Sequence, residues 1–178
     1  MERNNTLRDI HVRNIVNIIE SGNLEIDTGN AYAANDYLHD NIITYSSAFL
    51  EQTDCYTEIL GVRVRETTEG TLQKPALRIF FFDSCDIVPT ANAAFDLTDG
   101  TNTTIDDLQG TLDVAALGYV DLPSGASTLD TINNTYFINP LVVYTNTNRA
   151  IKAIAMTTGT PTFDATGAIQ IDLIVRHL

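Results

Sequence analysis

The sequence predicts an all-β protein: an antiparallel two-sheet sandwich, most simply a jelly roll, with an extended N-terminal arm. About eight short apolar segments are separated by turn-forming residues, which is the spacing of a sandwich. No helix long enough to connect parallel strands is apparent, so antiparallel pairing is expected. Polar positions are rich in Thr and Asn, which favour strands and turns. The 178 residues fit one domain with a full core. We expect residues 27–178 to form it, and residues 1–26 an arm or first hairpin.

The N-terminal quarter contains two expected strands and a loop. The β-branched residues of segment 10–19 favour a strand, and the turn Ser21-Gly22-Asn23 follows it. Leu24–Ile26 is then expected to return as the second arm of a short hairpin. Residues 32–40 are polar and predict a loop with one helical turn, and residues 42–50 predict the next strand.

The most apolar run of the chain is Leu77–Phe82, which predicts a strand buried on both faces. Residues 56–65 alternate, with Leu60, Val62 and Val64 expected to point inward. The polar segment 66–74 joins the two strands, so the pattern predicts that they are antiparallel neighbours.

The second half predicts a short helical turn at residues 104–110 and a strand at 111–120. Residues 136–144 contain Pro140, which predicts an edge or bulged strand. Strands are also expected at 150–156 and 168–178. In the last strand the inward positions should be Ile169, Ile171, Leu173 and Val175, and the outward positions Gln170, Asp172, Ile174 and Arg176.

The charge pattern argues against two classes of partner. The formal net charge is −13, which disfavours binding to nucleic acid and to anionic membranes. Only the first thirteen residues are locally basic. Arg3, Arg8, His11 and Arg13 form either a solvated terminus or an arm that docks on a partner.

The sequence holds no recognisable catalytic constellation, so we expect a non-enzyme without a cofactor. His11, His39 and His177 are far apart, and each is expected at the surface or in a loop. Cys55 and Cys85 lack metal-ligand spacing, and buried free thiols are preferred over a disulfide. Residues 96–107 fail the EF-hand pattern. Turn chemistry is preferred there over a looser calcium site, and no metal is expected.

Features for targeting and for sugar binding are sparse in this sequence. No signal peptide or membrane span is visible, which predicts synthesis in a cytoplasm. A carbohydrate-binding sandwich needs exposed aromatic rings, and this chain has no Trp. The aromatic residues in loop-like settings are Tyr32, Tyr37 and Tyr119, which keeps a carbohydrate- or receptor-binding module as an alternative.

Several segments resemble small β-sandwich proteins encoded among the structural genes of tailed bacteriophages. The resemblance spans most of the chain from residue 27 onward and is carried by motifs without catalytic character. The matching segments are DTGNAYAANDYLHD (27–40), ILGVRVR (59–65), PALRIFFFDS (75–84), LQGTLDVAA (108–116), GTPTF (159–163) and IQIDLIVR (169–176).

The resemblance implies a capsid decoration (cement) protein, a virion component on the outer surface of an assembled head. Its implied partners are the major capsid protein and further copies of itself, because many such proteins are trimers. The acidic composition agrees with a position away from packaged DNA. The alternative is a carbohydrate- or receptor-binding sandwich of a phage tail or fibre.

Overall fold

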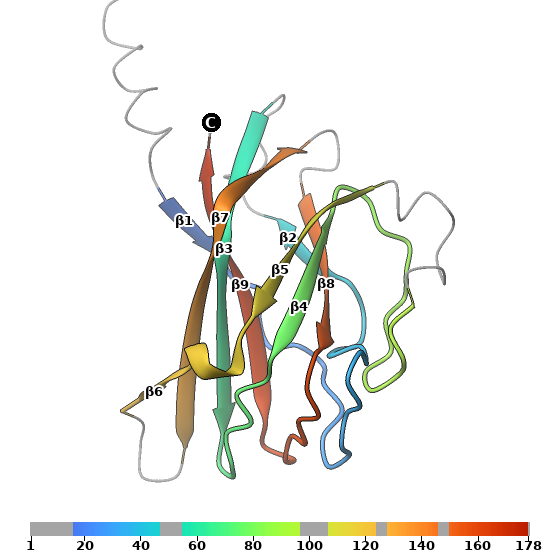
Figure 1. Ribbon diagram of the computed structural model, residues 1–178, viewed down its shortest axis with the longest axis vertical. Coiled ribbons are helices and arrows are strands. Elements are labelled where there is room, and N and C mark those ends of the chain that lie inside the picture. Colours follow the sequence, from blue (N-terminus) through green and yellow to red (C-terminus); the bar gives the residue numbers. More distant parts are fainter. Residues whose placement is uncertain (1–15, 47–54, 97–106, 124–127, 146–149, 178) are drawn as a thin grey trace, which may run out of the picture.

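The computed structural model is all-β, as the sequence predicts, and contains two antiparallel sheets that face each other (Figure 1). The structure describes residues 16–46, 55–96, 107–123, 128–145 and 150–177. One sheet has the strand order β1-β9-β3-β7-β6, and the other has the order β2-β8-β4-β5. The strands are β1 (Val16–Ile19), β2 (Ile43–Ser46), β3 (Cys55–Thr68), β4 (Leu77–Phe82), β5 (Leu108–Val114), β6 (Val120–Leu122), β7 (Leu129–Thr145), β8 (Ala150–Thr157) and β9 (Ala168–His177), with a 3₁₀ turn, η1, at Ala116–Gly118.

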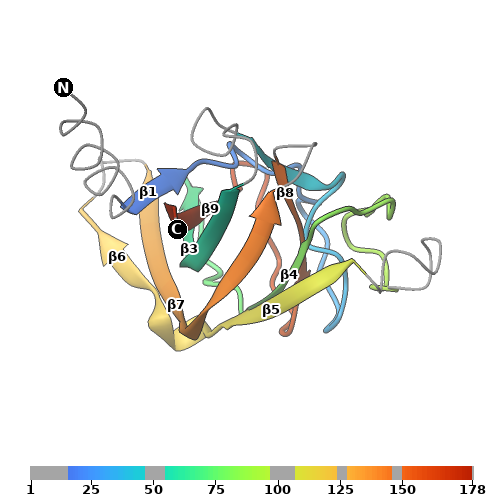
Figure 2. The same ribbon diagram turned by 90° about the horizontal axis from the view of Figure 1, so that it is seen from above.

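The strand pairs are nested along the chain. β1 pairs with β9, β2 with β8, β3 with β7 and β4 with β5, all antiparallel. Two further antiparallel pairs, β3 with β9 and β4 with β8, join these hairpin-like pairs into the two sheets. The fold is therefore a long antiparallel ribbon wrapped onto itself. Figure 2 shows β5 meeting β7 along one side of the sandwich.

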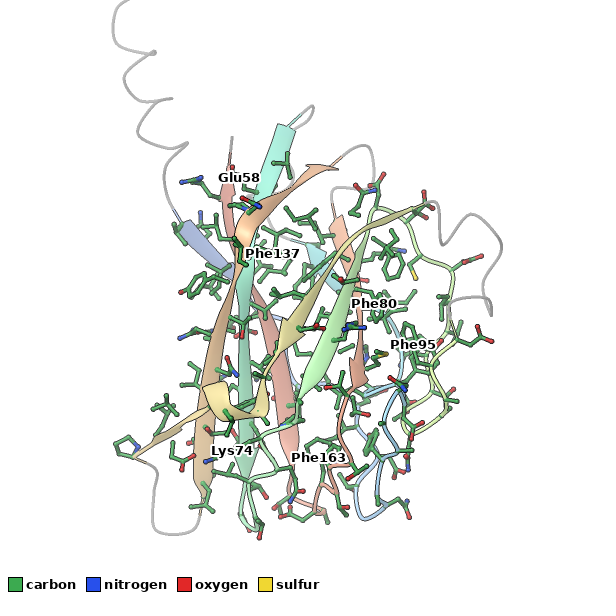
Figure 3. The ribbon with its side chains drawn as sticks, in the orientation of Figure 1. Glu58, Lys74, Phe80, Phe95, Phe137 and Phe163 are labelled. Carbon is green, nitrogen blue, oxygen red and sulfur yellow. The ribbon has the colours of Figure 1, made fainter. Side chains whose placement is uncertain are left out.

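The inner faces of both sheets form one apolar core. The predicted alternation of the last strand is confirmed, because its four inward residues are fully buried in this core. Phe81 of β4 faces the same core and lies against Phe137 of β7, with ring centroids 5.9 Å apart. This contact joins the two sheets, and Figure 3 shows Phe137 between them.

β4 is buried on both faces, as its sequence predicts. Ile79 and Phe81 point into the main core, whereas Phe80 and Phe82 point to the opposite face and a second cluster. Residues 83–96 cover that second face. Phe95 from this segment stacks on Phe80 with centroids 4.6 Å apart, and Ile87 is also buried there (Figure 3).

The predicted pairing of β3 with β4 is wrong. β3 lies between β9 and β7, and β4 lies between β8 and β5 in the other sheet. The connecting segment crosses from one sheet to the other. Glu66 fixes that crossing, because its carboxylate accepts hydrogen bonds from the backbone amides of Gln73 and Lys74, both at 2.7 Å.

A bulge changes the predicted alternation of β3. Ile59 pairs with Leu141 and Gly61 pairs with Tyr136, so four residues of β7, 137–140, are looped out of the ladder. Of the two alternatives predicted from Pro140, the bulge is confirmed, whereas β7 is not an edge strand, because it lies between β3 and β6. Its consequence was not predicted: Ile59 is fully buried, and Leu60 is only half-buried.

Two other segments differ from the sequence prediction. Leu24 does not return along β1, because β1 pairs with β9 and the Leu24 amide donates to the Ile169 carbonyl at 2.8 Å. Both halves of the expected hairpin therefore lie along β9. The expected helical turn is wrong at its described end, because Leu108–Gly110 is the start of β5.

Candidate functional site

The outer face of the five-stranded sheet is the candidate functional site. No described segment crosses this face in Figures 1 and 2, in contrast to the four-stranded sheet. A row of adjacent residues crosses it from β1 to β7, with Ile18 beside Ile174, Ile174 beside Gly61, and Gly61 beside Tyr136. Ile18 and Tyr136 at the ends of the row are 47% and 59% exposed, whereas Ile174 and Gly61 at its centre are buried. We call this row the apolar band.

The next row toward the end of β9 combines apolar and charged residues. Its order is Val16, Arg176, Glu58, Val142. Both valines are about half exposed. The Arg176 Nε atom donates to Glu58 Oε2 at 2.7 Å, so the two charges at the centre of the row neutralise each other.

The row on the other side of the apolar band is also charged at its centre. Arg63 donates from Nε and Nη2 to Asp172 Oδ2 at 2.9 and 2.7 Å, and its Nη2 lies 3.8 Å from Glu20. Asp172 is fully buried beneath Arg63 and also accepts from the Ser21 amide at 3.1 Å. Arg65 in the following row donates to Gln170. Ion pairs therefore border the apolar band on both sides.

A second exposed apolar cluster lies at the β6 end of the same sheet, and we call it the β6 patch. Leu117 of η1 is fully exposed, and Val120 of β6 is 63% exposed. Leu122 of β6 is also exposed on this face, whereas the exposed Leu129 at the start of β7 points to the opposite side of the sheet, because it pairs with Thr68. Lys74 and Asp121 form an exposed ion pair at 2.8 Å on the opposite side of β6, because Asp121 alternates with Val120 and Leu122 along the strand.

The site residues predicted from the sequence are not in this surface. Arg3, Arg8, His11 and Arg13 lie outside the described residues, as does most of the acidic loop 96–107. Within the part of the chain that the structure describes, no cluster of His, Cys, Asp or Glu could hold a metal ion. None of the described helices is long and apolar enough to cross a membrane.

The three loop tyrosines are buried, which removes them as sugar-stacking platforms. Tyr32 OH accepts from the Asp27 amide at 2.7 Å and donates to the Leu38 carbonyl at 2.9 Å, and burial raises its pKa to about 12. Tyr37 OH donates to the Asp96 carbonyl, and Tyr119 OH donates to the Pro75 carbonyl. These hydroxyls fasten loops to the sandwich.

His39 lies in a loop, as the sequence predicts, and is buried there. It replaces a backbone acceptor in the ladder along β8: the Ala155 amide donates to its Nε2 atom at 3.1 Å. Nε2 must therefore be unprotonated, so Nδ1 carries the hydrogen and donates to the Asp40 carbonyl at 3.1 Å. Burial lowers the pKa of His39, which matches the neutral form that this geometry requires.

Cys85 is a buried free thiol, in agreement with the preferred expectation for it. Burial raises its pKa, which makes it a poor nucleophile at neutral pH.

A polar pocket of about 220 Å³ is lined by residues from segments 21–25 and 39–44. Its side chains bond one another, as in the 3.0 Å contact from Asn41 to Glu25. We therefore find no ligand-directed group in it.

Sequence reasoning missed the apolar band, although one signal was present. Ile174 occupies an outward position in the predicted alternation of the last strand, where a polar residue would normally stand. Tyr136 and Ile18 join it only through strand pairing, which the sequence pattern does not specify.

In the comparison with known proteins, no family model, no curated protein and no solved structure matches the chain. The fold and the site define an all-β sandwich with one face covered by the chain's own segment 83–96 and one face that no described segment crosses. The resemblance to phage decoration proteins stays a prediction.

Proposed function

We propose that this protein is a structural virion protein that binds the outer face of a phage capsid and stabilises it. The observation that carries the proposal is the open face of the five-stranded sheet, with its apolar band and β6 patch. Large apolar side chains gathered on one face are typical of protein–protein interaction sites. A non-enzymatic role fits a molecule whose most distinctive surface is a contact face.

The nested strand pairs support the proposal, because they are the pairs of a fold that occurs in viral capsid proteins. We infer that the sandwich is a jelly roll, because its four nested pairs are those of an antiparallel ribbon folded over twice. Jelly rolls occur in viral capsid proteins and also in lectins. The burial of Tyr32, Tyr37 and Tyr119 favours the capsid role over the sugar-binding alternative.

Charge supports a position on the outside of a head. The chain has a net charge of −13, yet the open face pairs its three arginines, Arg63, Arg65 and Arg176, with Asp172, Gln170 and Glu58. An acidic surface elsewhere limits non-specific association and is unsuited to the DNA-facing side. The contact face can then dock without that repulsion.

The proposed partners are the major capsid protein and further copies of this chain. The basic residues Arg3, Arg8, His11 and Arg13 are proposed to contact an acidic capsid surface or a sister subunit. Removing residues 1–13 should leave the sandwich folded and reduce head binding. Unchanged head binding would retire the arm from the proposal.

The proposal is tested by adding the purified protein to capsids that lack it. We expect it to co-sediment with heads and to appear by electron microscopy at repeated sites on the shell. A variant carrying Val120→Asp and Leu122→Asp in the β6 patch should bind at least about tenfold more weakly, as for a contact hot spot. Val88→Asp is the matched control, because Val88 is 78% exposed but lies on the covered side. Localisation only at a tail tip would overturn the proposal.

A further inference from the structure

The apolar band and the two charged rows beside it are arranged symmetrically about a line between β9 and β3. On one side of that line lie β1 and β9, and on the other side lie β3 and β7. Each row places one residue of each strand in order: Val16, Arg176, Glu58, Val142 in the first and Ile18, Ile174, Gly61, Tyr136 in the second. In both rows, the two residues at equal distances on either side of this line match each other, either as opposite charges or as two uncharged residues.

We propose that this face binds a second copy of the same chain around a two-fold axis that runs between β9 and β3, parallel to the strands. Such an axis makes an isologous contact, in which each residue meets the partner's residue from the opposite side of the line. Two sheets that pack face to face keep their strands roughly aligned and lie about 10 Å apart.

The axis brings apolar side chains onto apolar side chains. Ile18 meets the partner's Tyr136, and Val16 meets the partner's Val142, all of them about half exposed in the single chain. Ile174 and Gly61, the residues nearest the axis, are buried in the single chain, so the flanking residues make the apolar contact. Each of these contacts occurs twice, once on either side of the axis.

The same axis brings opposite charges together. Arg176 faces the partner's Glu58. Asp172 is fully buried beneath Arg63 in the single chain, so the Arg63–Asp172 pair stays within each copy. The Arg176–Glu58 row is neutral within one chain, so this row adds no net repulsion between two molecules that each carry −13. Charge complementarity of this kind fixes the register of an interface and excludes misaligned copies.

The self-contact leaves the β6 patch free. β6 lies outside β7 on one side, beyond the strands that the axis superimposes. The four strands of the contact span roughly 15–19 Å at about 4.8 Å per strand, which is small for a permanent interface. We therefore expect a dimer that dissociates in the micromolar range. This inference does not depend on capsid binding, because the two experiments use different surfaces and different readouts.

The test is sedimentation equilibrium of the full chain between about 1 and 100 μM, a range chosen for a small interface. We expect a monomer–dimer equilibrium, with Tyr136→Asp weakening association at least about tenfold. Arg78→Glu on the other sheet is the control and should leave association unchanged, since Arg78 pairs with Asp113 outside this face. A strict monomer, a trimer, or a dimer indifferent to Tyr136→Asp overturns the inference.

A charge-swap mixture tests the symmetry itself. Glu58→Arg and Arg176→Glu should each abolish the homodimer, because like charges then meet across the axis. Mixed together, the two variants should form a heterodimer, since every arginine then faces a glutamate. Thermal unfolding of each variant verifies that it is folded before mixing, and a variant that does not fold is replaced by Glu58→Gln or Arg176→Gln, which should weaken the dimer without abolishing the fold. Folded variants that fail to recover association on mixing overturn the two-fold arrangement.

Discussion

The two sheets of this protein share one core, but their outer faces differ in what covers them. The four-stranded sheet turns Phe80, Phe82, Ile154 and Met156 outward, and the chain's own segment 83–96 covers them. The five-stranded sheet turns Ile18, Tyr136 and Val142 outward, and no described segment covers these residues. A strand's apolar content therefore does not show whether its outward residues stabilise the fold or contact a partner.

The largest expected effect separates the covered face from the open one. Phe80→Ala should lower the free energy of unfolding by about 3–5 kcal/mol, because it empties a site packed against Phe95. Tyr136→Ala should change it by less than about 0.5 kcal/mol, because that ring is exposed in the single chain. Urea unfolding at sub-micromolar protein measures both values. Similar costs for the two substitutions would mean that the faces do not differ.

A second comparison sets the ion pair of the open face against an exposed pair on the other sheet. Arg63→Met leaves the fully buried Asp172 carboxylate without its main partner and should cost about 3 kcal/mol, the low end for a buried pair, because Arg63 is partly exposed. Arg78→Met breaks an exposed pair with Asp113 and should cost less than about 1 kcal/mol. Chemical denaturation of dilute samples distinguishes them. An equal, small cost would show that Asp172 is satisfied by the Ser21 amide alone.

The bulge that sets the register of the open face depends on Gly61. A Cβ atom there would lie 2.1 Å from the Thr135 carbonyl oxygen, so Gly61→Ala must displace backbone. We expect a loss of about 1–3 kcal/mol, the usual cost of overpacking. Gly159→Ala is the control, because a Cβ atom at that position would meet nothing within 4 Å. Thermal unfolding should show a lower melting temperature only for Gly61→Ala.

The smallest expected effect is a pH dependence at the edge of the covered sheet. Because burial lowers the pKa of His39 below its ordinary value of 6.5, the unfolded chain binds a proton more readily than the folded one. The contribution of neutral His39 to the free energy of unfolding is therefore fully present above about pH 6.5 and is lost as the pH falls below that value. His39→Gln keeps an acceptor for the Ala155 amide without titrating there. Between pH 7.5 and 5, the urea midpoint should fall less steeply for this variant than for the unchanged protein. Identical slopes would show that His39 does not contribute to the pH dependence of stability.

Local pattern predicted the parts of the fold in which side-chain direction follows from the sequence alone. We predicted correctly that β4 is buried on both faces, which residues of β9 point inward, and that the segment around Pro140 carries a bulge. Alternation is a property of a single strand, so no partner is needed to read it. The same reasoning failed at Leu60, because a bulge exchanges the inward and outward positions beyond it.

The candidate site was less predictable than the fold. Its members Ile18, Ile174 and Tyr136 are far apart in the chain and become neighbours only through pairing. The basic residues Arg3, Arg8, His11 and Arg13 remain a separate prediction, outside the described residues. The sequence suggested that the loop tyrosines could stack on a ligand. In the structure their rings are buried, and their hydroxyl groups form tertiary hydrogen bonds.

The sequence by itself determined that this chain is an all-β sandwich and which residues of its regular strands face the core. Only the tertiary structure decided that β3 and β4 belong to different sheets, that segment 83–96 covers one outer face, and that the apolar band lies on the other. The physical reason is the sequence separation over which each feature is determined. Side-chain direction is set by backbone geometry over two residues, whereas strand partners and covering segments are set by packing between residues distant in the chain.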